Sequence, residues 1–320
     1  MTSKRPTILV LMGGPDAERD VSLASGAAVA AALRAARRFA TIDQVIERPT
    51  TQQLAAIALA AGADVIFPVL HGRWGEGGPL QEILEQIGLP YVGSGPDASR
   101  LAMNKLLTKD LLHAEGVQTP DALELRPDDE CRLDPPLVLK PIDDGSSVDL
   151  RICRSDEEID AARRALHPRR GNLLAERYIA GREMTVGVFE GSALPLLEIV
   201  PAVEFYDYDA KYVREDTRYV IDPEFDQSLK SLCCDIAVDA FHRLGCRDLA
   251  RVDFMIDEDG AWFLELNTMP GFTSHSLVPM AARHIGLEMP HLCERLVDAA
   301  IRRVGHADPA RTSSTSLTSP

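Results

Sequence analysis

The chain has 320 residues, of which 45% are hydrophobic and 26% charged, an ordinary composition for a globular protein of two or three domains. Its formal net charge of −15 argues against a nucleic-acid partner, because binding to a phosphate backbone normally leaves a basic footprint. Any anionic ligand must therefore be held by local positive charge and backbone N–H groups rather than by the overall field.

Cysteine usage and hydropathy bear on the compartment. The six cysteines show neither CxxC spacing nor the framework of a small disulfide-rich domain, which favours reduced thiols in a cytoplasmic protein. The uncharged, alanine-rich stretch at residues 21–33 is shorter than the ~18 residues that suggest a membrane span. We therefore expect a cytoplasmic location and no membrane partner.

The first hundred residues alternate between predicted strands and helices. The expected strands cover residues 8–12, 41–45, 65–68 and 90–92. The expected helices cover residues 22–37, 52–61 and 80–86. This alternation is typical of an α/β fold in which helices cover a parallel sheet.

Two further regions follow a predicted helix at 105–115. The second region has expected strands at 137–140 and 173–177 and a helix at 156–166. The third has expected strands at 184–189 and 194–200, a helix at 225–244, a hairpin at 251–267, and helices at 278–284 and 290–304. The polar tail at 312–320 has no face to bury, so we expect it to be disordered.

Two loops lie at the predicted carboxyl edge of the first sheet, where open α/β sheets bind ligands. Residues 13–20 follow the first strand and lack the Gly-Lys-Ser/Thr of a Walker A loop. Helix capping explains Asp20 well but Glu18 poorly, and a carboxylate at Glu18 is suited to hold a cationic amine. His71 follows the third strand among four glycines, a position that favours a role at a site.

The segment from Gly93 to Ala98 matches the dinucleotide-binding pattern G-x-G-x-x-G/A by its letters. It follows the fourth predicted strand rather than the first, and Pro96 lies within the loop. We interpret it as a linker between domains.

Three segments of the middle region are candidates for nucleotide and substrate contacts. Lys140 ends a strand just before 143–147, a Gly-Ser-Ser turn typical of a mobile phosphate-binding lid. Glu176 ends another strand. Two interpretations are open for this segment: an exposed hinge, or a contact with the ribose or adenine of a nucleotide. The tyrosine-rich loop at 205–212 is either a packed flap or a flap that closes a site and presents Lys211 or Tyr212.

The hairpin at 251–267 carries the strongest local signal for chemistry. Arg251 and Asp253 share one face of their strand, and Glu265 and Asn267 share one face of the next. Oxygen ligands of this kind suit Mg²⁺, which typically takes one or two carboxylates and adds substrate phosphate and water. The alternative is the solvated face of an edge hairpin.

The loop after this hairpin, residues 267–277, contains Gly271 and a run of hydroxyl side chains. These features suit a pocket for a substrate carboxylate. The alternative is a capped helix start, which Ser276 would serve equally well.

Taken together, the ordered motifs closely resemble those of the D-alanine–D-alanine ligases of the ATP-grasp superfamily, over about residues 8–304. The motifs are GGPDAERDVSLASG, LHGRWGEGGPLQ, YVGSGPDAS, LKPIDDGSSV, FYDYDAKY, RVDFMIDEDG and LELNTMPGFTSHSLVPMAA. No single motif would suffice, but the ordered set is highly specific.

The resemblance implies an α/β fold, α+β in part: a three-domain ATP-grasp fold whose N-terminal domain has a Rossmann-like parallel sheet. The implied divisions are an N-terminal domain at 1–97, a central subdomain at 98–182, a C-terminal subdomain at 183–306 and a disordered tail at 307–320. ATP would lie between the central and C-terminal subdomains.

The resemblance also implies roles for single residues toward ATP and its metal ions. Lys105, Lys140 and Ser147 match phosphate contacts. Adenine and ribose contacts match Glu176, Tyr178, Ile179 and Glu183. The ligands of two Mg²⁺ or Mn²⁺ ions match Asp253, Glu265 and Asn267.

Toward the amino acids, the resemblance implies that Glu18, helped by His71, takes the ammonium of the first D-alanine. Ser276, Leu277 and Gly271 would border the second D-alanine, and Arg251 would stabilise the oxyanion. Ser146 and Tyr212 would join Glu18 in a hydrogen-bonded network. The pair Lys211 and Tyr212 favours an amine acceptor over D-lactate.

The implied reaction joins two D-alanines through an acyl phosphate, releases ADP and phosphate, and supplies peptidoglycan precursors; a homodimer is expected. Three positions depart from the family pattern: Asn104 for an acidic residue, Ala250 for glycine, and Asp149 for glycine. Two alternatives remain open at this point. One is another ATP-dependent carboxylate–amine ligase, and the other is a nicotinamide-dependent oxidoreductase based on the Gly93 loop.

Overall fold

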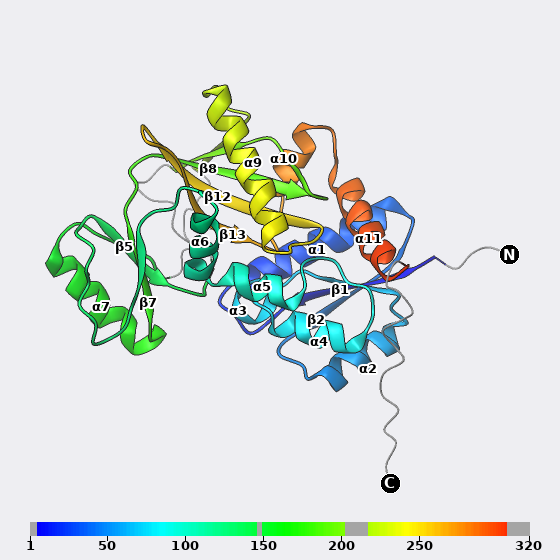
Figure 1. Ribbon diagram of the computed structural model, residues 1–320. Helices are drawn as coiled ribbons and strands as arrows, with labels where there is room; N and C mark the ends of the chain where they lie inside the picture. Colours follow the sequence, from blue (N-terminus) through cyan, green and yellow to red (C-terminus); the bar gives the residue numbers. More distant parts are fainter. Residues whose placement is uncertain (1–4, 146–148, 202–216, 306–320) are drawn as a thin grey trace, which may run out of the picture.

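The computed structural model describes residues 5–145, 149–201 and 217–305, and these form three sheets with helices packed around them (Figure 1). The sheets follow one another along the chain. The first lies in the N-terminal third, the second near the middle, and the third and largest in the C-terminal half.

The first sheet is parallel and has the strand order β2-β1-β3. Its strands are β1 (Thr7–Gly13), β2 (Ala40–Ile46) and β3 (Val65–Pro68). The helices of this region are α1 (Arg19–Ala36), α2 (Thr51–Ala61), α3 (Gly72–Gly75) and α4 (Pro79–Ile87). The predicted parallel sheet with covering helices is therefore confirmed.

One predicted strand of this region, residues 90–92, is wrong. Only an isolated parallel bridge joins Tyr91 to Ile66. Gly93 then takes a φ of +101°, so the backbone leaves the strand direction before a ladder forms.

The second sheet is antiparallel, with the strand order β4-β7-β5-β6. Its strands are β4 (Ala122–Leu125), β5 (Leu137–Pro141), β6 (Arg151–Cys153) and β7 (Leu173–Arg177). Helix α7 (Asp156–Arg170) covers one face and begins at Ser155, whose hydroxyl accepts the N–H of Glu158. Sheet and helix form the lobe at the left of Figure 1.

The third sheet is antiparallel, with the order β11-β10-β8-β12-β13, and β9 pairs with β8. Its strands are β8 (Arg182–Phe189), β9 (Ser192–Ala193), β10 (Leu197–Val200), β11 (Arg218–Ile221), β12 (Leu249–Asp257) and β13 (Gly260–Asn267). Helices α5 (Pro96–Met103), α6 (Lys105–Ala114) and α9 (Gln227–Arg243) pack against it. The predicted hairpin at 251–267 is confirmed as β12 and β13.

The interpretation of residues 93–98 as a linker between domains stays a prediction, but the segment is not a loop throughout, because α5 begins at Pro96. Gly95 is the N-cap of α5, and Pro96 is at the first helical position, where its missing N–H costs nothing. The Gly93 N–H donates to Asp248 Oδ2 at 2.7 Å, and the Arg247 N–H donates to the Ser94 hydroxyl at 3.1 Å. The loop is therefore tied to the third sheet.

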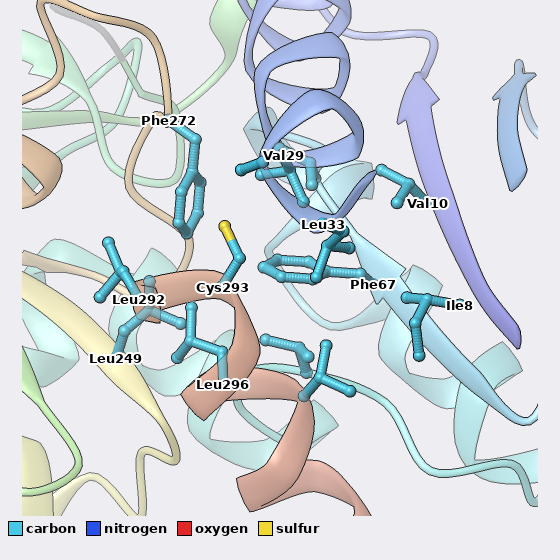
Figure 2. Close-up of a cluster of buried hydrophobic side chains, with 14 of the residues drawn as sticks. Ile8, Val10, Val29, Leu33, Phe67, Leu249, Phe272, Leu292, Cys293 and Leu296 are labelled. Carbon is cyan, nitrogen blue, oxygen red and sulfur yellow. The ribbon is translucent and has the colours of Figure 1, made fainter. Parts of the chain in front are cut away.

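Helix α10 (Leu277–His284) packs against β8 and β11 of the third sheet, and α11 (Met289–Gly305) returns to α1 and β3 of the first sheet region. Figure 2 shows Leu292, Cys293 and Leu296 of α11 facing Leu33 of α1 and Phe67 of β3. This core fixes the C-terminal half against the N-terminal sheet. None of the described helices combines the length and apolarity needed to cross a bilayer.

The division at 1–97, 98–182 and 183–306 stays a prediction. The three sheets fall in successive parts of it, although Ala98, Ala102 and Leu112 of helices α5 and α6 belong to the core of the third sheet. The predicted tail disorder at 307–320 concerns residues outside the described part of the chain.

Candidate active site

Two adjoining cavities lie beside the hairpin β12–β13. A cavity of about 300 Å³ extends between the second and third sheets and is lined by Lys140 and Glu176 on one side and Met255 on the other. A smaller cavity of about 90 Å³ extends toward the loop after β13. Asp253 and Glu265 line both cavities, so the polar face of the hairpin lies at the boundary between them.

The polar face of the hairpin is assembled as the period of two predicts. Asp253 lies directly opposite Glu265 in the ladder, and Arg251 lies opposite Asn267. Two of the three guanidinium nitrogens of Arg251 donate to the Asp253 carboxylate, Nε at 2.9 Å and Nη2 at 2.8 Å. Thr185 of β8 adds its hydroxyl at 2.6 Å from Asp253 Oδ1.

The alternative of a solvated edge hairpin is wrong for β12. This strand lies between β8 and β13, and its Asp253 is buried with 6% of its surface exposed. A bulge between Asp253 and Phe254 leaves Leu264 as the extra residue, so Leu264 and Glu265 both line the larger cavity. Phe254 and Phe263 face the core of the sheet and pack edge to face.

The donor set of this face fits a hard divalent cation. Two carboxylates, Asp253 and Glu265, and the amide oxygen of Asn267 supply oxygen ligands, the chemistry that Mg²⁺ and Mn²⁺ accept. No group of three histidine, cysteine, aspartate or glutamate side chains suited to a metal was found in the described part of the chain. A Mg²⁺ site here would therefore take its remaining ligands from substrate phosphate and water.

Lys105, the first residue of α6, brings positive charge to this face. Its Nζ lies 3.2 Å from Glu265 Oε2 and donates to the carbonyl oxygen of Asp144. Burial works against the charged form, but Glu265 in contact and Asp144 nearby outweigh it and raise the lysine pKa. Lys105 is therefore a fixed cation that lines both cavities.

Glu176 of β7 is shared by two lysines. Its Oε1 accepts from Lys140 of β5, and its Oε2 lies 3.1 Å from the Nζ of Lys109 of α6. Burial by itself would raise the Glu176 pKa, but the two ammonium groups lower it below the usual range. With 3% of its surface exposed, Glu176 itself is not part of an exposed hinge.

The strand end after Glu176 forms the far wall of the larger cavity. Tyr178 and Ile179 line it, and the Tyr178 N–H donates to the carbonyl oxygen of Pro136 at 3.1 Å. Glu183 of β8 lines both cavities. These three residues therefore lie together with Lys140 around one space of nucleotide size.

Glu18 is the N-cap residue of α1, but its side chain makes no capping hydrogen bond. The helix-capping alternative is therefore wrong for this carboxylate, which is buried with 5% of its surface exposed. A Cβ placed on Gly145 would lie 2.8 Å from Glu18 Oε2, so the start of the lid segment lies directly against Glu18.

His71 is buried beside the loop that follows β13. Its Nδ1 lies 3.0 Å from the carbonyl oxygen of Met269, and its Nε2 has no hydrogen-bond partner among the described residues. Burial lowers the His71 pKa to about 4, helped by the charge of Arg251. The ring is therefore neutral at pH 7, with Nδ1–H donating to the carbonyl and Nε2 left as an acceptor.

Glu76 lies next to His71, with Oε1 3.9 Å from Nδ1. It accepts the N–H groups of Gly72 and Met269 at 3.1 and 3.2 Å. Burial and the nearby Glu18 carboxylate raise the Glu76 pKa well above its usual range. Two buried carboxyl groups thus share this corner, and each disfavours the ionisation of the other.

The loop from Asn267 to Leu277 closes the smaller cavity, which Gly271, Ser276 and Leu277 line. The Ser276 hydroxyl accepts the N–H of Thr273 at 2.9 Å and makes no cap hydrogen bond to α10. The capping alternative is therefore wrong for its side chain. A Cβ on Gly271 would lie 2.8 Å from Ser276 Oγ, so glycine permits this close turn.

Two family models match the chain. One describes the D-ala D-ala ligase N-terminus and matches residues 40–94; the other describes the D-ala D-ala ligase C-terminus and matches residues 112–298.

The chain belongs to the D-alanine–D-alanine ligase family.

Whole-chain comparisons agree with these models. The chain is 44% identical over 317 residues to a D-alanine–D-alanine ligase of Bordetella petrii, covering 95% of this chain and 94% of that relative. It is 40% identical over 300 residues to a ligase of Syntrophotalea carbinolica, covering 92% of this chain and 96% of the relative.

Solved structures give the same result for the fold. The Bacillus anthracis D-alanine–D-alanine ligase complexed with ATP is similar with a TM-score of 0.83 at 30% identity, covering 96% of this chain and all (100%) of that one. The VanG D-Ala:D-Ser ligase of Enterococcus faecalis is similar with a TM-score of 0.79 at 27% identity, covering 93% and 100%. The three sheets of this ligase form the ATP-grasp fold.

The departures of this ligase from the family pattern have local explanations. Asn104 caps α6, since its Oδ1 accepts the N–H of Leu107 at 3.1 Å. Asp149 takes a φ of +60°, where glycine is usual, and its carboxylate is held by Arg169 and Arg170 at 2.9 and 2.7 Å. Ala250 is fully buried in β12.

Four predicted site residues of the ligase lie outside the described residues: Ser146, Ser147, Lys211 and Tyr212. The same holds for the whole predicted flap at 205–212 and for residues 146–147 of the predicted lid at 143–147. Their roles stay predictions.

Two residues beside the site, Lys109 and Glu76, were not singled out from the sequence. Lys109 follows Lys105 by four positions, so both fall on one face of the helix, and this spacing is the signal that would have found it. Glu76 gives only a weak signal, because it is one polar residue in a glycine-rich loop.

Proposed function

We propose that this chain joins two D-alanines to D-alanyl-D-alanine at the expense of ATP, through an acyl phosphate, and so supplies peptidoglycan precursors. The observation that carries the proposal is the hairpin face of Asp253 and Glu265, which stands between a lysine-lined cavity and a smaller cavity lined by Ser276. Relatives of the same length are D-alanine–D-alanine ligases, and one similar structure is complexed with ATP.

The larger cavity is the proposed ATP site. Lys105 and Lys140 would contact the phosphates, together with Ser147, and Glu176 would contact adenine. Tyr178 and Ile179 would also border adenine, and Glu183 the ribose. Asp253, Glu265 and Asn267 would hold two Mg²⁺ or Mn²⁺ ions, which when bound would offset the negative charge of the transferring phosphoryl group.

The first D-alanine is proposed to lie between the lid segment and the N-terminal loops. Its ammonium would meet the Glu18 carboxylate and the acceptor Nε2 of His71, whose Nδ1 is engaged by Met269. A neutral ring suits this role, because a second cation would repel the ammonium. The carboxylate of this D-alanine would then point to the phosphate-binding lysines and attack the γ-phosphorus of ATP.

The second D-alanine is proposed to occupy the smaller cavity, bordered by Gly271, Ser276 and Leu277. Its amine would attack the acyl carbon and release phosphate. Arg251, held in place by two hydrogen bonds to Asp253, would stabilise the oxyanion that forms. Ser146 and Tyr212 would join Glu18 over the substrates, and Lys211 would help to favour an amine acceptor.

The nicotinamide alternative has no support in the structure. The Gly93 N–H and the Ser94 hydroxyl are already bonded to Asp248 and Arg247, so the loop does not offer its backbone to a dinucleotide. Another carboxylate–amine ligase remains a second candidate, because a similar solved structure is a D-Ala:D-Ser ligase.

We also propose a cytoplasmic location and a homodimer without a nucleic-acid or membrane partner. All six cysteines are free, as expected in a reducing compartment. Light scattering on the purified chain tests the assembly: a mass near twice 35.0 kDa supports the dimer, and 35.0 kDa contradicts it.

The test of function measures phosphate release from ATP and Mg²⁺ with single amino acids and identifies the product by mass. D-Alanine should give phosphate and D-alanyl-D-alanine, whereas L-alanine should give neither. Phosphate release that requires D-serine or D-lactate as the second substrate would keep a ligase but reject D-alanine as the acceptor. Absence of ATP turnover with every acid would reject the function.

A further inference from the structure

Behind the proposed ATP site lies a buried cluster of three charged side chains. Glu176 of β7 accepts from Lys140 of β5 and lies 3.1 Å from Lys109 of α6. Lys140 and Glu176 line the larger cavity. Lys109 is 2% exposed and stands behind them, outside the described lining of either cavity.

The position of Lys109 is set by three elements. It lies one helical turn after Lys105, which faces the cavity from the same side of α6. Its Nζ also donates to the carbonyl oxygen of Phe263 on β13 at 3.1 Å and lies 5.9 Å from the Phe263 ring. Lys109 thus reaches from a helix packed on the third sheet to a strand of the second.

Charge counting shows what this lysine changes. A pair of Lys140 and Glu176 alone is neutral, so Lys140 would attract a phosphate only weakly. With Lys109 sharing the carboxylate, the cluster carries a net charge of about +1. Burial lowers the Lys109 pKa to about 8 against the pull of Glu176, so the ammonium form still prevails at pH 7.

We propose that Lys109 is a positioning residue for the ATP site: by taking one oxygen of Glu176, it leaves Lys140 with net positive charge toward the triphosphate. This rests on the proposed function. Lys109 does not touch the nucleotide in this account; it acts through Glu176 and Lys140.

The test is a double-mutant cycle of Lys109→Met and Glu176→Gln, read as the dissociation constants of ATP and of adenosine by calorimetry and competition. The ratio of the two constants within each variant isolates the triphosphate contribution, so any contact of residue 176 with adenine cancels. Lys230→Met is the matched control, because Lys230 of α9 pairs with the exposed Asp222 and lines neither cavity.

Lys109→Met should weaken the triphosphate contribution on the order of tenfold, because the cluster becomes neutral. The double variant leaves Lys140 unpaired and positive, so it should return close to the wild-type ratio. In the Glu176→Gln variant, the triphosphate contribution to binding should be at least as large as in the wild-type chain. Lys230→Met should leave the ratio unchanged.

If the triphosphate contribution in the double variant is as small as in Lys109→Met, the proposal is overturned. A purely structural role of Lys109 would not be restored by removing the carboxylate of Glu176. If Lys109→Met fails to fold, the comparison of the double variant with the wild-type chain decides instead: a ratio close to the wild-type ratio supports the proposal, and a clear loss overturns it. A wild-type chain that binds adenosine and ATP equally would overturn the ATP site itself. Normal ATP binding with an unaffected Lys109→Met would overturn only the role of Lys109.

Discussion

At the scale of single residues, His71 shows how one hydrogen bond selects a chemical form. The Met269 carbonyl oxygen accepts a hydrogen bond from Nδ1–H, and burial lowers the His71 pKa to about 4, so Nε2 is the acceptor position left on the neutral ring. The same ring on an exposed loop would be partly protonated near pH 6.5 and would repel an ammonium group.

The depressed pKa predicts a pH dependence of stability that His71→Gln should remove. Above pH 6.5 the ring is neutral in the folded and unfolded chain. Below 6.5 only the unfolded chain takes up the proton, so stability falls as the pH drops toward about 4, by up to about 3 kcal/mol. Urea unfolding of both proteins between pH 7 and 4 measures this difference, and parallel curves would contradict the buried neutral ring.

Arg251 carries a second prediction at this scale. Its guanidinium is held by Asp253 and positioned for an oxyanion that exists only during the reaction. Arg251→Ala should therefore lower turnover on the order of 10²–10³, while the dissociation constant of ATP stays near the wild-type value. Steady-state kinetics and calorimetry on the same preparation check this, and equal losses in turnover and ATP affinity would remove Arg251 from that role.

Residues whose positions follow from strand alternation were predictable from the sequence. A residue that contacts site residues without lining a cavity, such as Lys109, was not. The alternation of Arg251 and Asp253 predicted their shared face, because side chains of a strand alternate strictly. Lys109 acts through contacts with β7 and β13, which lie far away in the sequence. The spacing of four residues from Lys105 indicates only a shared helix face, and these long-range contacts are not contained in any local pattern.

At the scale of elements, the β12–β13 hairpin was predictable as a unit, but its bulge was not. The turn residues between Asp257 and Gly260 and the two apolar runs indicate paired strands. One extra residue, Leu264, then shifts the register so that it joins Glu265 in facing the larger cavity. Period-two counting alone would have turned Leu264 toward the core.

Short edge elements were the ones that sequence patterns did not predict. Strand β4 reads Ala-Leu-Glu-Leu, without β-branched or aromatic residues, and it is a strand because it pairs with β7. Strands β6 and β11 have three and four residues and likewise depend on their neighbours. Conversely, the match of residues 93–98 to a dinucleotide loop concealed the start of α5.

The lid segment gives a prediction at the element scale, through Gly145→Ala. The added Cβ would lie 2.8 Å from Glu18 Oε2, so the carboxylate must move away from the proposed ammonium position. The Michaelis constant for D-alanine at the first site should rise, while the midpoint of thermal unfolding stays unchanged, because the displaced atom ends a side chain.

The matched control is Gly95→Ala, whose Cβ would meet only the end of Arg247, at 3.5 Å. It should leave the Michaelis constant unchanged. A normal constant for Gly145→Ala as well would show that Glu18 does not hold the ammonium.

At the scale of the whole molecule, the site depends on segments that are distant in sequence. The Phe272 N–H donates to the Ser25 hydroxyl of α1 at 3.0 Å, and the Phe272 ring packs edge to face on Phe67. The core shown in Figure 2 therefore places the loop that borders the smaller cavity against the first sheet. The order of elements predicted the sheets, whereas this closure comes from packing alone.

Charge is also distributed at this scale. The chain carries a formal net charge of −15, yet Lys105 and Lys140 line the larger cavity and Lys109 lies behind them. The overall field repels a nucleotide, so the local cluster must supply the attraction. The same negative net charge argues against a nucleic-acid partner and requires a local cluster of positive charge for a nucleotide.

The central claim is that the whole assembly activates the carboxylate of D-alanine by phosphoryl transfer. The most direct measurement uses D-alanine labelled with ¹⁸O in its carboxylate and determines the label in the released phosphate by mass spectrometry. The account predicts transfer of labelled oxygen to phosphate, because the oxygen that attacks the γ-phosphorus leaves with it when the amine attacks the acyl carbon. Formation of the dipeptide with unlabelled phosphate would contradict the account.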